Sequence, residues 1–404
     1  MSRLSLRRAV TLFVLFAVLF ESSLASVLAV DYGSDWIKAS LMKPGVPFDV
    51  LLNKDSKRKM QSCVAWKKEE RLFGSDAANI VSPAPTAPRT CSDRTQASRF
   101  PQDSFSSLKY LQGAPFNSDI VTYFTSISTA QISETDRKTV ALKQSDGTEW
   151  STEELVAMQL SYIKKLAQDL AGETVNEVII TVPPYFSQFE RDSVADAIEI
   201  AGLRTLALIN DGTAVAVNYA MTRTFSTTSE YHVIYDAGAS STRATVVSFT
   251  GAEDPKTKAP YTQIDVLGVG YDRNTGGTEL DLRLRDILID NFISKHRRDI
   301  RKDNRGMAKL WKEAGRVKTI LSANSDAMST VSSVASCRLS FGAHGHQVES
   351  VAFDIDFKAK VTRAQFEDAC KDLHSRFARP IHDALANAEL SLVLITLNNL
   401  EIVV

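Results

Sequence analysis

The chain has 404 residues, of which 44% are hydrophobic and 24% charged, a balance that excludes a disordered or fibrous protein. Its formal net charge of -1 at pH 7 gives no overall attraction to nucleic acid, so no nucleic-acid partner is expected. The chain is too long to fold around a single small hydrophobic core, so two or more lobes are predicted.

Residues 1–25 have the pattern of a secretory signal peptide. Several arginines precede the apolar stretch AVTLFVLFAVLF, and small residues follow it up to Ala25, where cleavage is expected. The stretch is too short to span a bilayer comfortably, and no later one is long and apolar enough, so no membrane span is predicted.

Four cysteines, Cys63, Cys91, Cys337 and Cys370, are spaced too widely for a zinc site or a CxxC redox pair. In an oxidising lumen this spacing leaves two alternatives open, a disulfide between Cys63 and Cys91 or buried free thiols.

The stretch VLAVDYGSDWIKASL predicts a strand, a tight turn and a second strand. Its apolar run stops at Asp31, and the chain turns through Gly33 and Ser34. Such a turn can direct backbone N–H groups at an anion beside a carboxylate, although Asp and Gly are also common in ordinary hairpins. Downstream, residues 46–74 predict short strands and turns, and residues 82–118, rich in Ser, Pro, Ala and Thr, predict irregular surface structure.

The stretch STEELVAMQLSYIKKLAQDLAG predicts a helix that begins with a capping box of Ser151 and Glu154 and ends at Gly172. The strand EVIITV, the amphipathic helix SVADAIEIAGL and the strand RTLALIN follow. This alternation predicts a mixed α/β lobe with a crossover connection.

A polar segment, residues 222–230, separates this lobe from YHVIYDAGASSTRATVVSF, which again predicts strand, turn and strand. Helices are expected near 279–297, 307–323 and 362–389. Pro380 is expected to kink or break the last of them.

The two predicted hairpins repeat one arrangement: an apolar strand, D-x-G, small hydroxyl residues and a β-branched exit strand. One copy starts at Asp31 and the other at Asp236, about half a chain apart. The repeat predicts a duplicated fold with a cleft in which backbone amides hold a polyphosphate from both sides. The two acids would hold Mg²⁺ through its water molecules, because Mg²⁺ gives up its hydration shell reluctantly.

The order of motifs resembles the nucleotide-binding domain of the heat shock protein 70 superfamily over nearly all of residues 27–390. The motifs are AVDYGSDW, ITVPPYFSQFERDSVADAIEIAGL, LINDGTAVAVNYA, IYDAGASST, GGTELD and VKTILSAN. Together with the signal, INDGTAVAVNYA and RVKTILSANSDAMSTV are similar to the large lumenal branch, the hypoxia up-regulated and glucose-regulated chaperones of the endoplasmic reticulum.

The resemblance implies an α/β, actin-like (ribonuclease H-like) ATPase domain with two duplicated lobes. The expected boundaries are a signal peptide over 1–25, lobe I over 26–226, lobe II over 227–390 and a divergent apolar tail over 391–404. Lobe II is expected to be incomplete at its C-terminal side, because no strand ending in a Gly-Gly turn follows ALANAEL. An early stop, a retained intron or a fragmentary gene model would explain such a truncation, which also leaves out the final subdomain, the substrate-binding β-domain and a lumenal retention tail.

The resemblance also implies site residues. Asp31, Asp211 and Asp236 would be catalytic, with Asp236 near the attacking water, and Asp31 and Asp236 would hold Mg²⁺ through water. The remaining expected nucleotide contacts lie in the phosphate loops and the adenosine helix: Gly33, Ser34, Asp35, Trp36, Gly238, Ala239, Ser240, Ser241, Gly276, Gly277, Lys318 and Ser322.

Some residues depart from the family pattern. Asn79 stands where a lysine that assists hydrolysis is usual, and Arg243 stands where an acid is frequent. Gly315 and Thr319 replace an acid and an arginine that are common in the adenosine helix. Because an uncharged amide stabilises a transferring phosphoryl group less than a lysine does, nucleotide binding with slow hydrolysis is expected.

The implied function is that of a chaperone of the endoplasmic reticulum lumen that binds ATP or ADP with Mg²⁺. It would couple nucleotide binding and slow hydrolysis to the folding or translocation of unfolded client proteins, and act as an exchange factor for a smaller lumenal chaperone of the same superfamily. Two alternatives stay open, a nucleotide-stabilised binding module without turnover and an actin-fold phosphotransferase such as a sugar kinase. TVPPYF and LSAN, which lie outside the phosphate loops, disfavour the phosphotransferase.

Overall fold

A computed structural model describes residues 26–43, 45, 49–67, 69–81, 101–331 and 357–391. The expected signal peptide and the apolar tail beyond Ser391 lie outside these residues, as do Cys91 and Cys337. Within the described part of the chain, no helix combines the length and the apolar character needed to cross a membrane.

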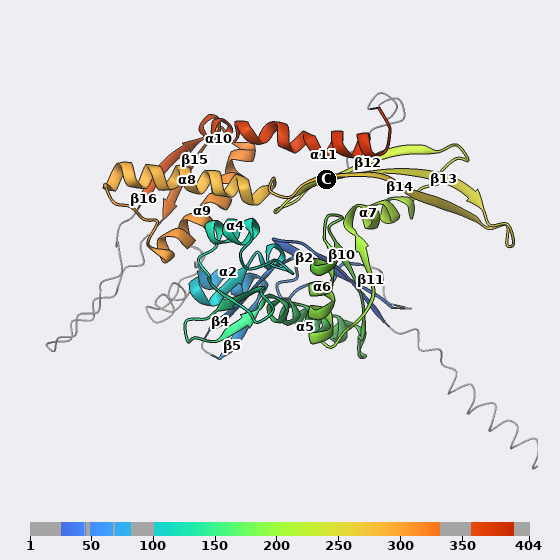
Figure 1. Cartoon of the computed structure of the whole chain (residues 1–404), viewed down its shortest axis with the longest axis horizontal. Coiled ribbons are helices and arrows are strands. Elements are labelled where there is room, and N and C mark those ends of the chain that lie inside the picture. The colour runs from blue at the N-terminus through green and yellow to red at the C-terminus, as the bar shows by residue number, and fades with distance from the viewer. Residues whose placement is uncertain are drawn as a thin grey trace, which may run out of the picture.

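The first lobe is built on a five-stranded sheet, whose strands are β1 (Val27–Tyr32), β2 (Trp36–Met42), β3 (Met60–Gln61), β10 (Glu177–Val182) and β11 (Arg204–Asn210). Their order across the sheet is β11-β10-β1-β2-β3. Figure 1 labels β2, β10 and β11 of this sheet. β1 pairs antiparallel with β2 and parallel with β10, which pairs parallel with β11. Helix α6 (Gln188–Ile200) connects β10 to β11 and confirms the predicted crossover.

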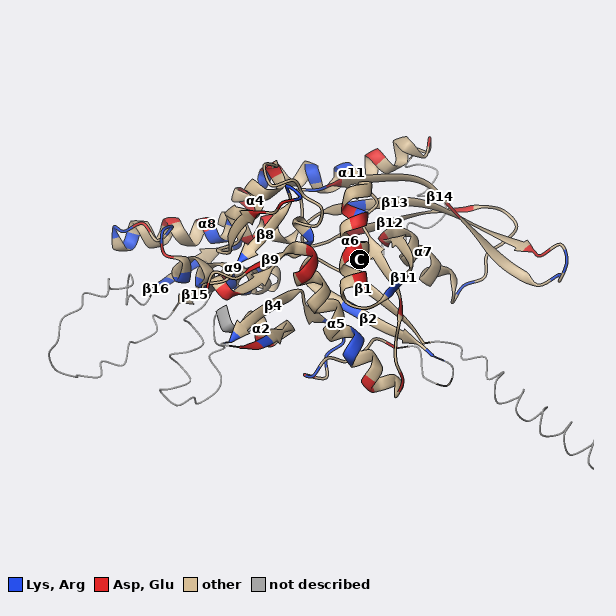
Figure 2. Ribbon diagram, turned by 60° about the horizontal axis from the view of Figure 1, so that its bottom comes forward, with Lys and Arg blue, Asp and Glu red and all other residues tan. Residues whose placement is uncertain are grey.

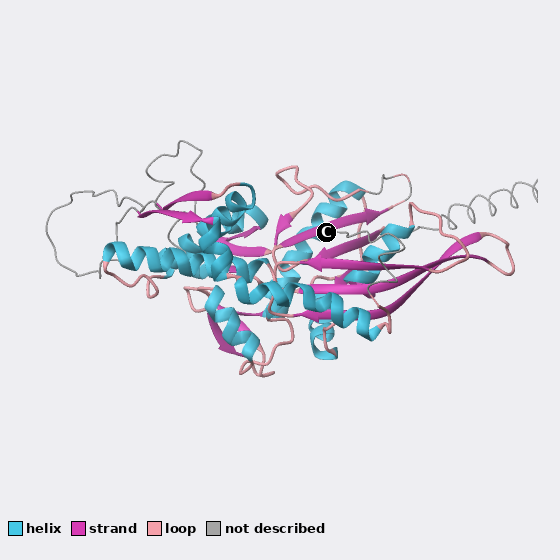
Figure 3. Cartoon of the chain, turned by 90° about the horizontal axis from the view of Figure 1, so that it is seen from above, coloured by secondary structure: helices cyan, strands magenta, loops and turns pink. Residues whose placement is uncertain are grey.

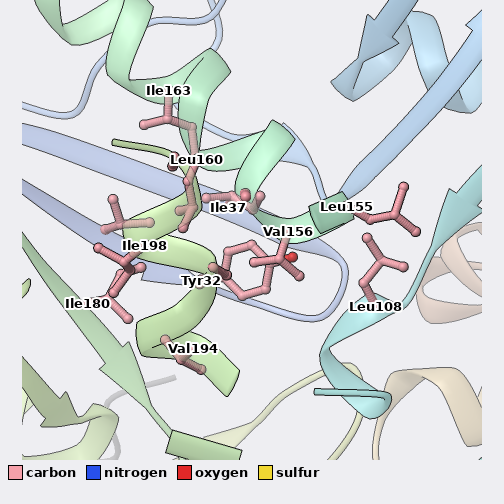
Figure 4. Packing of buried hydrophobic residues seen from close by; sticks show 14 of the residues in the cluster. Tyr32, Ile37, Leu108, Leu155, Val156, Leu160, Ile163, Ile180, Val194 and Ile198 are labelled. Atoms are coloured by element: carbon pink, nitrogen blue, oxygen red, sulfur yellow. The ribbon is translucent and has the colours of Figure 1, made fainter. Parts of the chain in front are cut away.

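Helix α5 (Thr152–Ala171) covers this sheet and has the predicted ends. Both hydrogen bonds of the Ser151–Glu154 capping box are present, and Gly172 ends the helix with φ 68°. Figure 4 shows α5 side chains next to Tyr32 and Ile37 of the first hairpin, in a core that is shielded from water. The turn between β1 and β2 is therefore supported by a closely packed core.

Two small sheets and several short helices complete the first lobe. They are β4 (Cys63–Lys67), β5 (Glu70–Phe73) and β6 (Ser104–Ser106) in one sheet, β7 (Gln131–Glu134), β8 (Val140–Lys143) and β9 (Glu149–Ser151) in the other, helices α2 (Gly74–Val81) and α4 (Asp119–Ile127), and the 3-10 turns η1 (Pro101–Asp103) and η2 (Leu108–Tyr110).

The prediction of irregular surface structure over 82–118 is wrong for part of that range. Residues 82–100 lie outside the described residues, but Phe105, Leu108 and Leu111 are fully buried in the core of the first lobe. Their large apolar side chains outweigh the polar composition of the segment, because burial of each one removes its surface from water.

The second lobe contains an antiparallel meander of β12 (Glu230–Ala237), β13 (Thr242–Glu253) and β14 (Pro260–Asp272). Helices α7 (Asp211–Ala220) and α11 (His374–Asn387) pack on its two faces. Val246 faces the α11 side with Ala384, whereas its neighbour Val247 faces the α7 side with Ala216. Successive side chains of a strand point to opposite faces of the sheet, and here both faces are buried, one under each helix.

The outer part of the second lobe consists of α8 (Gly277–His296), α9 (Asn304–Ala323), β15 (Asp326–Val331), β16 (Phe357–Thr362), α10 (Arg363–Ala369) and η3 (Lys371–Leu373). Seen from above, α8 and the long β13–β14 hairpin extend toward opposite ends of the molecule (Figure 3). Lys and Arg are interspersed with Asp and Glu over the ribbons (Figure 2).

The helices predicted near 279–297 and 307–323 are confirmed as α8 and α9. The third predicted helix breaks at Cys370, not at Pro380, which lies inside α11. Tight packing keeps α11 continuous there, since a Cβ on Gly270 of β14 would lie 2.1 Å from the Pro380 carbonyl oxygen.

Cys63 and Cys370 are buried free thiols. Burial raises the pKa of each to about 11, so neither is a reactive thiolate near neutral pH. Cys91, the partner in the alternative disulfide of Cys63, lies outside the described residues.

Candidate functional site

The two predicted hairpins have the same backbone geometry. The Gly33 amide donates to the Trp36 carbonyl at 3.2 Å, and the Gly238 amide donates to the Ser241 carbonyl at 3.0 Å. Each closes a two-residue loop at the end of an apolar strand. The duplication expected from the sequence is therefore present in the fold.

Each hairpin also pairs its acid with a base on the opposite strand. Asp31 lies across from Lys38 in the β1–β2 register, with a Lys38 Nζ to Asp31 Oδ2 distance of 2.8 Å. Asp236 lies across from Arg243 in the β12–β13 register and binds its guanidinium. The acids were predicted from the sequence, but their cross-strand partners follow only from the register.

The two hairpin loops meet between the lobes. Ser34 Oγ lies 2.7 Å from Ser240 Oγ, although the residues are far apart in the sequence. The Tyr185 hydroxyl, from the VPPYF segment before α6, donates to Ser241 Oγ at 2.9 Å. The facing loops thus form one site rather than two separate turns.

Arg243 holds two acids from different elements. One terminal nitrogen of its guanidinium binds Asp211, the first residue of α7, and the other binds Asp236 at the end of β12. Its side chain is only 12% exposed, and its Nε has no hydrogen-bond partner within the described residues. Burial would lower the pKa of Arg243, but the two carboxylates outweigh it and raise the pKa. Burial raises the pKa of Asp211, and the charges of Arg243 and Lys109 offset this only in part.

Lys109 is a site residue that sequence reasoning missed. It lies in η2, between the buried Leu108 and Tyr110, and its Nζ donates to the Tyr32 carbonyl at 2.6 Å. Burial, followed by the charge of Arg243, lowers the pKa of Lys109 to about 8, and three nearby acids oppose the shift. The only signal in the sequence was a lysine inside the apolar run SLKYL.

Lys109 supplies a lysine to this centre, since it interacts with Asp31, Asp211 and Asp236. Asn79 belongs to α2, and its side chain lies outside the described part of the structure, so the slow hydrolysis expected from its amide stays a prediction.

The predicted Gly-Gly loop lies against the second hairpin. The Gly277 amide donates to the Gly238 carbonyl at 2.9 Å, and the next amide donates to the Ala239 carbonyl at 2.8 Å. A Cβ on Gly276 would lie 2.5 Å from the Ala239 carbonyl oxygen, so this approach requires glycine. 

Lys318 of α9 reaches the same loop. Its Nζ donates to the Gly277 carbonyl at 3.0 Å and to Asp281 Oδ2 at 2.7 Å. Burial raises the pKa of Asp281 to about 6, against the opposing charge of Lys318. Loss of hydration likewise raises the pKa of Asp35 in the first hairpin, and Lys318 again opposes the shift. Lys318 is thus electrostatically linked to both lobes.

Most of the predicted site residues therefore gather where the lobes face each other. These are Asp31, Gly33, Ser34, Asp35, Asp211, Asp236, Gly238, Ala239, Ser240, Ser241, Gly276, Gly277 and Lys318. Trp36 contributes its carbonyl to the hairpin, while its ring lies 4.3 Å from Lys59 Nζ. Ser322 is exposed and bonds to the Thr319 carbonyl of its own helix at 2.7 Å, so nothing in the structure brings it to the hairpins.

A pocket opens beside the two loops. Its polar lining consists of Lys109, Tyr185, Ser240 and Arg273, and its apolar lining consists of Tyr110, Ile120 and Phe186. Two cations and two hydroxyl groups next to an aromatic wall are suited to an anionic group attached to a larger molecule.

The acids of this site do not fit a hydrated Mg²⁺ ion as they are arranged. In the described part of the chain, no three His, Cys, Asp or Glu side chains are grouped to bind a metal directly. Arg243 occupies the space between Asp211 and Asp236, while Asp31 binds Lys38 and accepts a hydrogen bond from Thr181 Oγ1 at 2.9 Å.

Comparison with known proteins agrees with the motif order. A family model described as "Hsp70 protein" matches residues 27–403. The chain is 40% identical over 387 residues to Hypoxia up-regulated protein 1 of Xenopus laevis, an alignment that covers 94% of this chain and 54% of the relative. It is 36% identical over 392 residues to the heat shock protein 70 homolog lhs1 of Schizosaccharomyces pombe, covering 95% and 42%. For Hypoxia up-regulated protein 1 of Homo sapiens the identity is 36% over 394 residues, covering 94% and 36%. The chain thus spans about half the length of these relatives or less.

Proposed function

The chain belongs to the Hsp70 family, and from this membership we propose that it is the nucleotide-binding part of a chaperone of the endoplasmic reticulum lumen, with ATP or ADP as its ligand. The nucleotide-binding domain of this family has the actin-like ATPase fold, and the sheets and helices of both lobes are a mixed α/β arrangement of that kind. Proteins of this family bind ATP or ADP together with Mg²⁺.

The observation that carries the proposal is the contact between the two hairpin loops, Ser34 to Ser240 at 2.7 Å. It brings the backbone amides of both loops to one place, where Lys109 supplies positive charge and Arg243 neutralises Asp211 and Asp236. Backbone amides and cations that converge from two sides are the elements that bind a polyphosphate. The Gly-Gly loop and Lys318 would contact the nucleoside side of the ligand.

The carboxylates of Asp31, Asp211 and Asp236 would act on the transferred phosphoryl group and its attacking water. Each is held by a base: Asp31 by Lys38, and the other two by Arg243. Burial opposes it, but the charge of Lys38 lowers the pKa of Asp31, which makes this carboxylate a weaker proton acceptor. We therefore expect slow hydrolysis.

The same pairing favours a second candidate, a nucleotide-stabilised binding module without turnover. Steady-state phosphate release separates the two candidates, since only the chaperone ATPase releases phosphate from ATP continuously. Addition of a panel of sugars tests the remaining alternative, because a phosphotransferase would consume ATP faster with its acceptor present.

The proposed setting and partners rest on relatives of the large lumenal branch. A signal peptide over 1–25, lobe I over 26–226, lobe II over 227–390 and an apolar tail over 391–404 are the proposed divisions. Unfolded proteins would be its clients, and a smaller lumenal chaperone of the same superfamily would be its exchange partner. The similarity to Hypoxia up-regulated protein 1 and to lhs1 supports this proposal.

Calorimetric titration with ADP and ATP tests nucleotide binding. The variant Lys109→Met removes a cation from the site, and Lys165→Met removes an exposed lysine of α5 as its matched control. We expect binding by the parent chain and by the control, and a loss of about 10-fold or more in affinity for Lys109→Met. No binding by the parent, or equal binding by both variants, would overturn the proposal.

A further inference from the structure

Acids and bases balance at the facing ends of the two hairpins. The acids are Asp31, Asp211 and Asp236, and the bases are Lys38, Lys109 and Arg243. The cluster therefore has no excess negative charge with which to attract a divalent cation.

Arg243 differs from Lys38 although the two have equivalent positions, each across from the acid of its hairpin. Lys38 is about half exposed and reaches one acid, whereas the Arg243 side chain is 12% exposed and bridges two. Bridging requires the planar fork of a guanidinium, because the point charge of an ammonium group lacks that geometry.

The two acids bridged by Arg243 come from different parts of the fold. Asp211 follows β11 of the first lobe, and Asp236 ends β12 of the second. A guanidinium that joins these two carboxylates beside the hairpin loops supplies positive charge of the kind that a Mg²⁺ ion would bring.

We propose that Arg243 replaces Mg²⁺ between Asp211 and Asp236, so that this chain binds ADP and ATP without requiring a divalent cation. This proposal rests on the proposed nucleotide-binding function. It makes Arg243 a specificity-determining residue: its fixed positive charge neutralises the two carboxylates that would repel the phosphates, and Lys109 adds a further positive charge nearby.

The proposal has a consequence that does not involve nucleotide. Without Arg243, Asp211 and Asp236 lose the cation that pairs with both and keep only the charge of Lys109 nearby, so Arg243→Ala should both loosen the free protein and create a Mg²⁺ site. Arg376→Ala is a matched control, because Arg376 pairs with a single acid, Asp272, at 2.8 Å elsewhere in the second lobe.

Thermal unfolding of the nucleotide-free chain, in MgCl₂ or in NaCl of equal ionic strength, tests this consequence. We expect Arg243→Ala to melt lower than the parent in NaCl and to regain about 2 °C or more in MgCl₂, whereas the parent and Arg376→Ala show no specific response to Mg²⁺. A specific rise of the parent's melting temperature in MgCl₂ would overturn the proposal, as would no rise for Arg243→Ala.

Titration of the parent chain with ADP, in EDTA and in MgCl₂, is the second test and needs no variant to fold. We expect dissociation constants within about 3-fold of each other, and for Arg243→Ala an affinity about 10-fold or more higher with Mg²⁺. Parent binding that requires Mg²⁺ would overturn the substitution of Arg243 for the metal and leave the proposed function standing. No binding in either buffer would overturn both.

Discussion

At the scale of single residues, Lys109 shows how neighbours set the chemistry of a side chain. Its flanking residues Leu108 and Tyr110 are buried, which fixes the lysine at the edge of the core with its ammonium group toward the acids. The resulting pKa of about 8 lies well below that of a free lysine, so its charge changes within an accessible pH range.

This pKa predicts a pH dependence of nucleotide binding. Above about pH 8 the ammonium group of Lys109 loses its proton and its charge, so affinity for ADP should fall as the pH rises through this value. Lys109→Arg keeps a charged group at all these pH values and should remove the dependence. Titrations between about pH 7 and about pH 9 measure it, and an equal slope for both chains would contradict the assignment.

Some residues of the site could be predicted from the sequence and others could not. Asp31 and Gly33 belong to a short local pattern, D-x-G after an apolar strand, so they could be recognised directly. Lys109 could not be, because its proximity to Asp211 depends on long-range packing that no local pattern records. The Arg243 bridge likewise required both the hairpin register and the position of α7.

At the scale of elements, the two hairpins are alike in hydrogen bonding but differ in how tightly they close. A Cβ on Gly33 would lie 2.3 Å from the Trp36 carbonyl oxygen, whereas a Cβ on Gly238 would lie 3.3 Å from the Ser241 carbonyl oxygen. The first hairpin has no room for a side chain, while the second has nearly enough.

The difference predicts unequal effects of one substitution. Gly33→Ala should lower the free energy of unfolding by roughly 1–3 kcal/mol, because the backbone must shift to accept the methyl group. Gly238→Ala should cost less than half as much. Urea unfolding of both variants measures the difference, and equal costs would show that the hairpins close alike.

Helix α11 shows tertiary packing overriding a local signal. Pro380 was expected to kink or break it, since proline lacks an N–H and its ring crowds the preceding turn. The helix nevertheless continues across β14, where Gly268 and Gly270 let the two backbones approach closely. The chain breaks instead at Cys370, a position that the pattern of apolar residues did not indicate.

This packing predicts that a methyl group at Gly270 is costly. Its Cβ would lie 2.1 Å from the Pro380 carbonyl oxygen, so Gly270→Ala should push α11 away and lower the free energy of unfolding by about 1–3 kcal/mol. Gly315→Ala is the control, because that glycine lies inside α9 with its nearest atom at 3.8 Å and should gain helix propensity. If chemical denaturation gives both variants the same free energy of unfolding, the contact between α11 and β14 does not stabilise the helix.

At the scale of the whole molecule, the two lobes meet through polar and apolar contacts. Tyr123 donates to Glu279 at 3.1 Å across the boundary, and Ser34 contacts Ser240. Leu282 of α8 and Trp311 of α9 pack against the core of the first lobe. Interfaces between the units of one chain generally permit relative movement. A ligand that binds both hairpins would therefore tie the lobes together.

Hydrogen exchange of the chain with and without saturating ADP tests the central claim, that both hairpins hold one nucleotide, most directly. We predict that ADP slows the exchange of amides in three segments at once, Gly33–Trp36, Gly238–Ser241 and Gly276–Thr278, because phosphate oxygens and closure of the lobes protect them. Protection of one hairpin alone, or of neither, would contradict the account.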